Sequence, residues 1–173
     1  KKFLNLKNKK KIVSLTAYSN NISSILDKYC DLVLVGDSLA NVLYGMKNTH
    51  SLNLNTMINH AQSVKKGIKK SLFIVDMPKN SYKTVKEAIK NAKIIIKKTG
   101  CDGVKIENNF SNLKIIESMC KSKINVMGHI GYTPQFKKKF KVEGKKLSEQ
   151  IKLLKQAKKI ENAGAFSIVL ECI

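Results

Sequence analysis

The sequence predicts an α/β fold of parallel strands, because short apolar runs alternate with segments of helical spacing along all 173 residues. The pattern is clearest at residues 32–38, where four apolar residues are followed by glycine, aspartate and serine. A continuous apolar run bounded by turn residues is typical of a strand buried in a parallel sheet. The carboxylate and hydroxyl after it stand where α/β folds bind their ligands.

Six apolar runs are expected to form strands, with five helices connecting them by right-handed crossovers. The expected strands are residues 12–16, 32–36, 72–75, 103–107, 124–129 and 166–171. The expected helices are residues 19–29, 56–70, 84–98, 111–121 and 148–163, with amino-terminal caps at Thr56 and Ser111 and stops at Gly100 and Gly164. Residues 37–55 and 130–145 are expected to be long loops. No linker or repeat separates a second unit, so residues 1–173 are predicted to be one domain.

The composition limits the classes of partner. The formal net charge is +21, but all 33 basic residues are lysines spread over nearly every helix. Proteins that read nucleic-acid sequence rely on arginine, so a nucleic-acid partner is not expected. No apolar run approaches the roughly 18 residues of a membrane span, and no signal peptide is evident, so a cytoplasmic protein without a membrane partner is expected. The four cysteines lack metal-binding spacing and are expected to be free thiols.

Ionisable side chains lie at the carboxyl ends of five consecutive predicted strands. They are Asp37, Asp76, Lys105 with Glu107, His129 and Glu171, and Ser38 follows the first of them. In a barrel of parallel strands these ends converge on one mouth. A single charged residue there would be explained by contact with solvent. Five strands in a row, in a chain with only 12 acidic residues, favour a functional site.

The residue types suggest a metal-assisted reaction. Asp37, Asp76 and Glu107 are hard oxygen ligands that would repel one another unless a cation or a proton offset their charge. Mg²⁺ suits such ligands, whereas structural zinc would call for a cysteine cluster. Lys105 faces the same side of its strand as Glu107, and it can neutralise an anionic substrate or pair with the carboxylates. Glu171, on another strand, can stay free of the metal and accept a proton next to a polarised carbonyl.

Six motifs in order make a more specific pattern than any one of them. They are Thr-Ala-Tyr at 16–18, Leu-Val-Gly-Asp-Ser-Leu at 34–39, Asp-Met-Pro at 76–78, Val-Lys-Ile-Glu at 104–107, Gly-His-Ile-Gly-Tyr-Thr-Pro-Gln at 128–135 and Leu-Glu-Cys at 170–172. From about residue 8 onward the chain resembles the ketopantoate hydroxymethyltransferase family. The resemblance implies a TIM (β/α)8 barrel of pantothenate and coenzyme A biosynthesis, assembled as a homo-oligomer, typically a decamer. It also implies transfer of a hydroxymethyl group from 5,10-methylenetetrahydrofolate to 3-methyl-2-oxobutanoate, giving 2-dehydropantoate.

The resemblance also implies roles for individual residues. Asp37, Asp76 and Glu107 match the Mg²⁺ site of the family. The residues with which the family contacts the oxo acid match Asp37, Ser38, Asp76 and Lys105 here, and His129 lies close to them in the pattern. Glu171 matches the proton acceptor.

Some features depart from the family pattern. Ser19 stands where aspartate is usual, Lys79 replaces an apolar residue, and the loop after Gln135 is shorter. A complete barrel needs about 200 residues or more, so the barrel is expected to be truncated after strand six and incomplete at the C-terminus. Two alternatives stay open: a Mg²⁺-dependent lyase or mutase acting on 2-oxo acids, and an inactive truncated barrel that serves as a binding or subunit protein.

Overall fold

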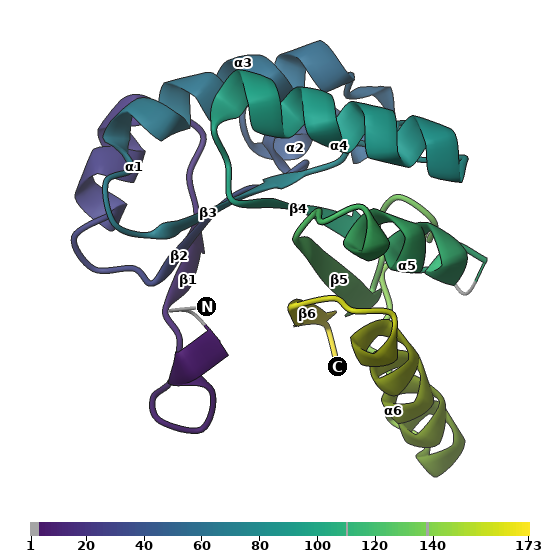
Figure 1. Cartoon of the computed structure of the whole chain (residues 1–173). Helices are drawn as coiled ribbons and strands as arrows, with labels where there is room; N and C mark the ends of the chain where they lie inside the picture. Colours follow the sequence, from purple (N-terminus) through teal and green to yellow (C-terminus); the bar gives the residue numbers. More distant parts are fainter. Residues whose placement is uncertain (1–3, 110, 138) are drawn as a thin grey trace.

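The computed structural model describes residues 4–109, 111–137 and 139–173, and in these residues six parallel strands form one sheet in the order β1-β2-β3-β4-β5-β6. The strands are β1 (Ser14–Thr16), β2 (Leu32–Val35), β3 (Leu72–Asp76), β4 (Gly103–Glu107), β5 (Val126–Gly131) and β6 (Ser167–Glu171). The helices are α1 (Asn20–Leu26), α2 (Leu39–Val42), α3 (Leu54–Gly67), α4 (Val85–Thr99), α5 (Leu113–Lys121) and α6 (Leu147–Asn162), with short 3-10 helices η1 (Leu4–Leu6) and η2 (Thr49–Ser51). The sheet is curled with the longer helices outside it, as in part of a (β/α) barrel (Figure 1). The predicted α/β class is confirmed.

Two apolar layers hold the sheet, because successive side chains of a strand point to opposite faces. Val33, Phe73 and Val104 belong to the buried cluster that the helices cover. Leu32, Ile74 and Met127 form a second cluster on the concave face. Burial of each such side chain stabilises the fold by about 1.5–3 kcal/mol. Apolar residues therefore fill the concave face toward the amino ends of the strands, and polar residues occupy its carboxyl-end rim.

Helix α4 lies within one residue of the predicted range 84–98 at each end, and it stops at Gly100 as predicted. The Thr84 hydroxyl accepts a hydrogen bond from the amide of Glu87 at 3.2 Å. At the other end Gly100 has a φ of +65° and donates its amide to the carbonyl of Ile96 at 2.9 Å. A left-handed residue after the last turn is the usual stop for a helix, and glycine adopts it without strain.

Other boundaries were predicted wrongly. Helix α3 begins one turn earlier than expected, because Asn53 accepts a hydrogen bond from the amide of Thr56 at 2.9 Å and is the cap in its place. Asn112, not Ser111, precedes α5, and the Ser111 hydroxyl bonds to Asn109 instead. The expected loop at 37–55 contains α2 and η2. These helices have only four and three residues, too few to show a helical period.

Strands β1 and β6 each pair on one side only within the described sheet. Apolar side chains are exposed at both edges: Leu15 of β1 is 48% exposed and Leu170 of β6 is 60% exposed. A hollow of about 700 Å³, lined mainly by apolar atoms of β1, α6 and β6, lies between them. Parallel strands are usually paired at their edges and covered on both faces, so this surface has the character of a packing interface.

Two expectations from composition can be compared with the structure. No helix in the described ranges combines the length and the apolar character needed to cross a membrane. Cys30, Cys101, Cys120 and Cys172 are all free thiols, as their spacing predicted.

Candidate active site

One pocket of about 640 Å³ opens at the carboxyl ends of the strands. It is lined by all seven side chains that the sequence places at strand ends, namely Asp37, Ser38, Asp76, Lys105, Glu107, His129 and Glu171. They converge because every strand runs in the same direction and the sheet is curled. This pocket is therefore the candidate active site.

Lys105 and Asp76 form a buried ion pair at the centre of the site. The register of β3 and β4 sets them directly opposite each other, and Nζ of Lys105 lies 2.7 Å from both carboxylate oxygens of Asp76. The backbone amide of Asp37 also donates to Asp76, at 3.0 Å. Burial by itself lowers the pKa of Lys105, but Asp76, Asp37 and Glu107 together raise it above its ordinary value. Lys105 is therefore a fixed positive charge among these carboxylates.

Glu107, at the end of β4, is a strongly perturbed acid of the site. Its side chain is 1% exposed, and Oε2 accepts the backbone N–H of Gln135 at 2.9 Å. Within the described part of the chain, Oε1 has no hydrogen-bond partner. Burial raises the pKa of Glu107 to about 8, since the favourable field of Lys105 is partly offset by Asp37 and Asp76. In the absence of another cation, the carboxyl group of Glu107 takes up a proton near neutral pH.

This raised pKa predicts that the metal-free protein loses stability as the pH rises. Between the ordinary value of 4.5 and the folded value of about 8, the folded state keeps the Glu107 proton while the unfolded state has lost it. The free energy of unfolding should then fall by about 1.4 kcal/mol per pH unit from this group. Urea unfolding of the native protein in EDTA at pH 5.5 and 7.5 measures the slope. Glu107→Gln should flatten the slope of the free energy of unfolding against pH. The control is Glu117→Gln, on the exposed face of α5, which should keep the wild-type slope. A wild-type slope in Glu107→Gln would contradict the assignment.

His129 lies between two carboxyl groups on neighbouring strands. Its Nδ1 is 3.8 Å from Oε1 of Glu107, which is its direct partner in the β4–β5 register. Its Nε2 is 3.1 Å from Oε2 of Glu171, whose side chain is 41% exposed and faces the same pocket. The close contact with His129 lowers the pKa of Glu171. Glu171 is thus ionised at neutral pH and free to accept a proton from a molecule in the pocket.

Gly131 lets β5 and β6 approach closely enough to place Glu171. Its φ is +90°, and a β-carbon at this position would lie only 2.1 Å from the backbone carbonyl oxygen of Glu171. These two residues are partners in the β5–β6 register. A larger residue would have to separate the strands, so glycine is required here by both backbone angle and space.

Three polar residues in or beside the pocket were not predicted to have a role: His50 lines the pocket, and Tyr18 and Gln135 bond to residues that line it. The Tyr18 hydroxyl lies 2.8 Å from Oγ of Ser38, and Ser38 makes no capping bond to α2, so its hydroxyl belongs to the pocket. Nε2 of His50 is 3.0 Å from the carbonyl oxygen of Pro134. Gln135 bonds to two of the acidic residues. All three lie outside strands, where no sequence period marks which residues face a pocket.

The acidic residues of the pocket can be compared with the needs of a divalent cation. Among the described residues, no three His, Cys, Asp or Glu side chains are grouped so that they could enclose a metal ion. The charge of Asp76 is balanced by Lys105. Among the described residues, neither Asp37 nor Glu107 forms an ion pair with a lysine. Oε1 of Glu107 is also buried without a hydrogen-bond partner among these residues. Mg²⁺ typically takes one or two carboxylates and fills its other positions with water and substrate oxygens. The residues therefore fit an open, oxygen-rich Mg²⁺ site rather than a closed one.

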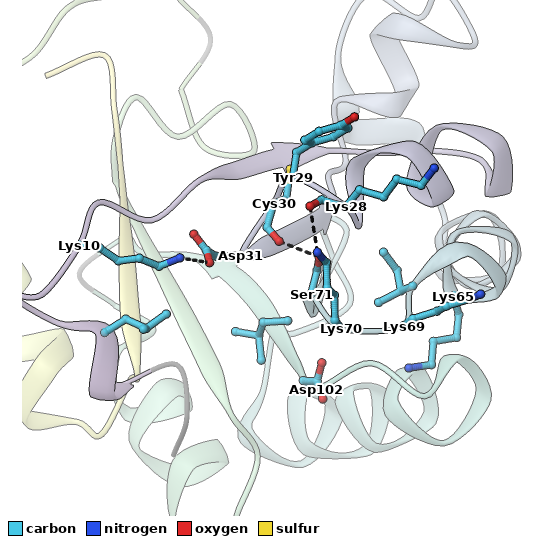
Figure 2. Close-up of a pocket in the computed structure, with 13 residues that line it drawn as sticks. Lys10, Lys28, Tyr29, Cys30, Asp31, Lys65, Lys69, Lys70, Ser71 and Asp102 are labelled. Atoms are coloured by element: carbon cyan, nitrogen blue, oxygen red, sulfur yellow. Dashed lines mark hydrogen bonds and ion pairs between the residues drawn. The ribbon is translucent and has the colours of Figure 1, made fainter.

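A second pocket, of about 550 Å³, lies at the opposite ends of the strands (Figure 2). Lysines and aspartates line it, and several of them bond to one another or to backbone groups. Lys10 pairs with Asp31 at 2.5 Å, and Nζ of Lys70 donates to the carbonyl of Lys28 at 2.9 Å. None of the buried side-chain atoms that lack a partner in the described residues belongs to this pocket. In (β/α) barrels this end serves stability, and the polar residues here fit that role.

Fold and site together define a class: a barrel-type α/β protein whose acidic pocket lies at the carboxyl ends of parallel strands. Solved structures agree on the fold. The structure of 2,3-dimethylmalate lyase, a PEP mutase/isocitrate lyase superfamily member, matches 98% of this chain and 62% of its own with a TM-score of 0.69 at 14% identity. Phosphonopyruvate hydrolase, solved with oxalate and Mg²⁺, matches 96% of this chain and 60% of its own with a TM-score of 0.74 at 9% identity. The fold is thus that of a TIM barrel, here with six strands described.

The family is defined by sequence. The model of the family described as ketopantoate hydroxymethyltransferase matches residues 1–173, and the chain belongs to this family. The 3-methyl-2-oxobutanoate hydroxymethyltransferase of Pelagibacter ubique is 53% identical over 171 residues, covering 99% of this chain and 66% of the relative. That of Bartonella tribocorum is 46% identical over 171 residues, covering 96% and 63%. The chain spans just under two thirds of the length of these relatives.

Proposed function

We propose that the native protein containing this chain transfers a hydroxymethyl group from 5,10-methylenetetrahydrofolate to 3-methyl-2-oxobutanoate, with consumption of water, to give 2-dehydropantoate and tetrahydrofolate. The observation that carries the proposal is the convergence of the family's motif residues on one pocket, in a chain that the family model matches throughout. The step belongs to pantothenate biosynthesis. Assembly into a homo-oligomer, in the cytoplasm, is part of the proposal and rests on the family alone.

Each residue has a proposed role. Asp37, Asp76 and Glu107 would hold Mg²⁺, which when bound would polarise the 2-oxo group and acidify the adjacent C3–H. Lys105 supplies a buried positive charge for the carboxylate of the oxo acid. The Ser38 hydroxyl and His129 face the same pocket and would orient the substrate.

Glu171 would accept the proton from C3 of the oxo acid. Its carboxylate is ionised, because the close contact with His129 keeps its pKa below the ordinary value, and it is partly open to the pocket. The two electrons of the C3–H bond then form the carbon–carbon bond to the one-carbon unit, and both bonds from that carbon to the folate nitrogens break. Water supplies the hydroxyl group of the product, and the proton from C3 and the second proton of the water end on the two nitrogens of tetrahydrofolate. The buried His129 fixes the orientation of Glu171 during this transfer.

The proposal is tested by incubating the native protein with 3-methyl-2-oxobutanoate, 5,10-methylenetetrahydrofolate and Mg²⁺. Formation of 2-dehydropantoate, lost on addition of EDTA, is expected. Deuterium exchange at C3 without folate separates proton removal from group transfer. Carbon–carbon cleavage of other 2-oxo acids without hydroxymethyl transfer would favour a lyase, and absence of both exchange and transfer would favour a binding or subunit role.

A further inference from the structure

Gln135 links the ends of three strands from the loop after β5. Its side chain is 1% exposed. The backbone amide donates to Oε2 of Glu107 at 2.9 Å, and Nε2 of the side chain donates to Oδ2 of Asp37 at 2.8 Å and to the carbonyl of Met77 at 3.1 Å. These three residues lie at the ends of β4, β2 and β3. One residue thus holds two of the proposed metal ligands at once.

The orientation of this amide group is fixed by its neighbours. The carbonyl of Met77 can only accept a hydrogen bond, so the nitrogen of the amide must be the atom that faces it. On the other side Oε1 accepts a hydrogen bond from the hydroxyl of Tyr82, which is itself buried. Both N–H groups and the oxygen of the Gln135 side chain are therefore in use, and the group cannot rotate without losing several bonds.

Gln135 fixes two carboxylates without cancelling their charge. Asp76 is paired with the ammonium of Lys105, whereas Asp37 and Glu107 receive neutral N–H donors from Gln135. A neutral donor sets the direction of a carboxylate but leaves its negative charge for another partner. In Glu107 the bond occupies Oε2, and the buried Oε1 is left without a hydrogen bond among the described residues.

We infer that Gln135 is a positioning residue for a hard divalent cation: it holds one oxygen each of Asp37 and Glu107 so that the remaining oxygens are directed to the ion. The inference rests on the proposed Mg²⁺ dependence. Outer partners of this kind typically change metal affinity by about 10- to 100-fold. The residue does not touch the reacting atoms, so its loss should act on cation binding rather than on the chemical step.

The test is the affinity of the native protein for Mn²⁺, measured by EPR titration without substrates. Gln135→Leu should raise the Kd about 10- to 100-fold. Gln62→Leu on the exposed side of α3 should leave the Kd unchanged, because among the described residues the Gln62 amide donates to the carbonyl of Lys98 and not to the pocket. In turnover, Gln135→Leu should raise the Mg²⁺ concentration needed for half-maximal rate while kcat recovers at saturating Mg²⁺, a rescue that general loosening of the fold would not give.

A second variant tests the inference independently in case Gln135→Leu does not fold. Tyr82→Phe keeps the Gln135 amide but removes the hydroxyl that fixes it, and should weaken Mn²⁺ binding about fivefold, in keeping with one neutral hydrogen bond. Unfolding midpoints in EDTA show which variants are folded. Wild-type affinity in either folded variant overturns the inference and leaves the proposed function standing. Absence of Mn²⁺ binding by the wild type would overturn the proposed cation itself, and the role of Gln135 with it.

Discussion

Glu171→Gln in the native protein is expected to lower the rate of hydroxymethyl transfer by about 10²- to 10⁴-fold, the usual contribution of a positioned general base. The amide is nearly the same size as the carboxylate but cannot accept a proton from carbon. Because Glu171 is partly exposed and His129 is its ion-pair partner among the described residues, the substitution should leave the fold intact. The measurement is deuterium exchange at C3 of 3-methyl-2-oxobutanoate with Mg²⁺ and without folate, followed by NMR.

Two further readouts show where this substitution acts. Binding of the oxo acid should change little, because Lys105 and the acidic residues remain in place. Glu117→Gln on α5 is the matched control: this carboxylate is exposed and pairs with Lys121 at 2.6 Å, far from the pocket in the fold. It should exchange and transfer at the wild-type rate. Exchange at the wild-type rate in Glu171→Gln would mean that another group removes the proton.

The regular part of the fold could be predicted from the sequence because it follows a period. The buried run at Leu32–Val35 and the helix between Thr84 and Gly100 are each set by local chemistry, and both lie where they were expected. The segment between β2 and α3 could not be predicted in the same way. Both Asn53 and Thr56 are good caps, and the choice between them depends on which turn packs against the sheet.

The candidate site, like the fold, was predictable where its residues lie on regular strands. Asp76, Lys105 and Glu107 stand on strands, so the alternation of side chains and the common direction of the strands bring them together. Gln135 stands in a loop, 98 residues away from Asp37, and only the folded chain shows that they touch. The sequence also left open how clustered carboxylates are tolerated. The structure uses both a cation and a proton to offset the clustered charge: Lys105 is buried beside Asp76, and the pKa of Glu107 is raised.

Lys105→Met should lower the free energy of unfolding by about 3–5 kcal/mol at pH 8 in EDTA, because it removes the cation of a buried pair and leaves its partner uncompensated. Methionine has similar length and no charge, so packing is largely kept. Lys105 is 6% exposed and lies 2.7 Å from both oxygens of Asp76, with Asp37 and Glu107 also contributing to its field. Urea unfolding of the native protein measures the loss.

The pH dependence separates this explanation from a simple packing defect. The folded-state pKa of Lys105 lies above its ordinary 10.5, so its stabilising effect is complete below pH 10.5 and is lost only as the pH rises through the folded value. Without Lys105 the buried carboxyl groups should take up protons more readily, and the deficit of Lys105→Met should therefore shrink between pH 8 and pH 5. Lys121→Met removes an exposed lysine from the pair with Glu117 and should leave the free energy of unfolding nearly unchanged at both values. If Lys105→Met lowers the free energy of unfolding equally at pH 5 and pH 8, the loss comes from packing. The charge of Lys105 would then not explain how three acidic side chains share one pocket.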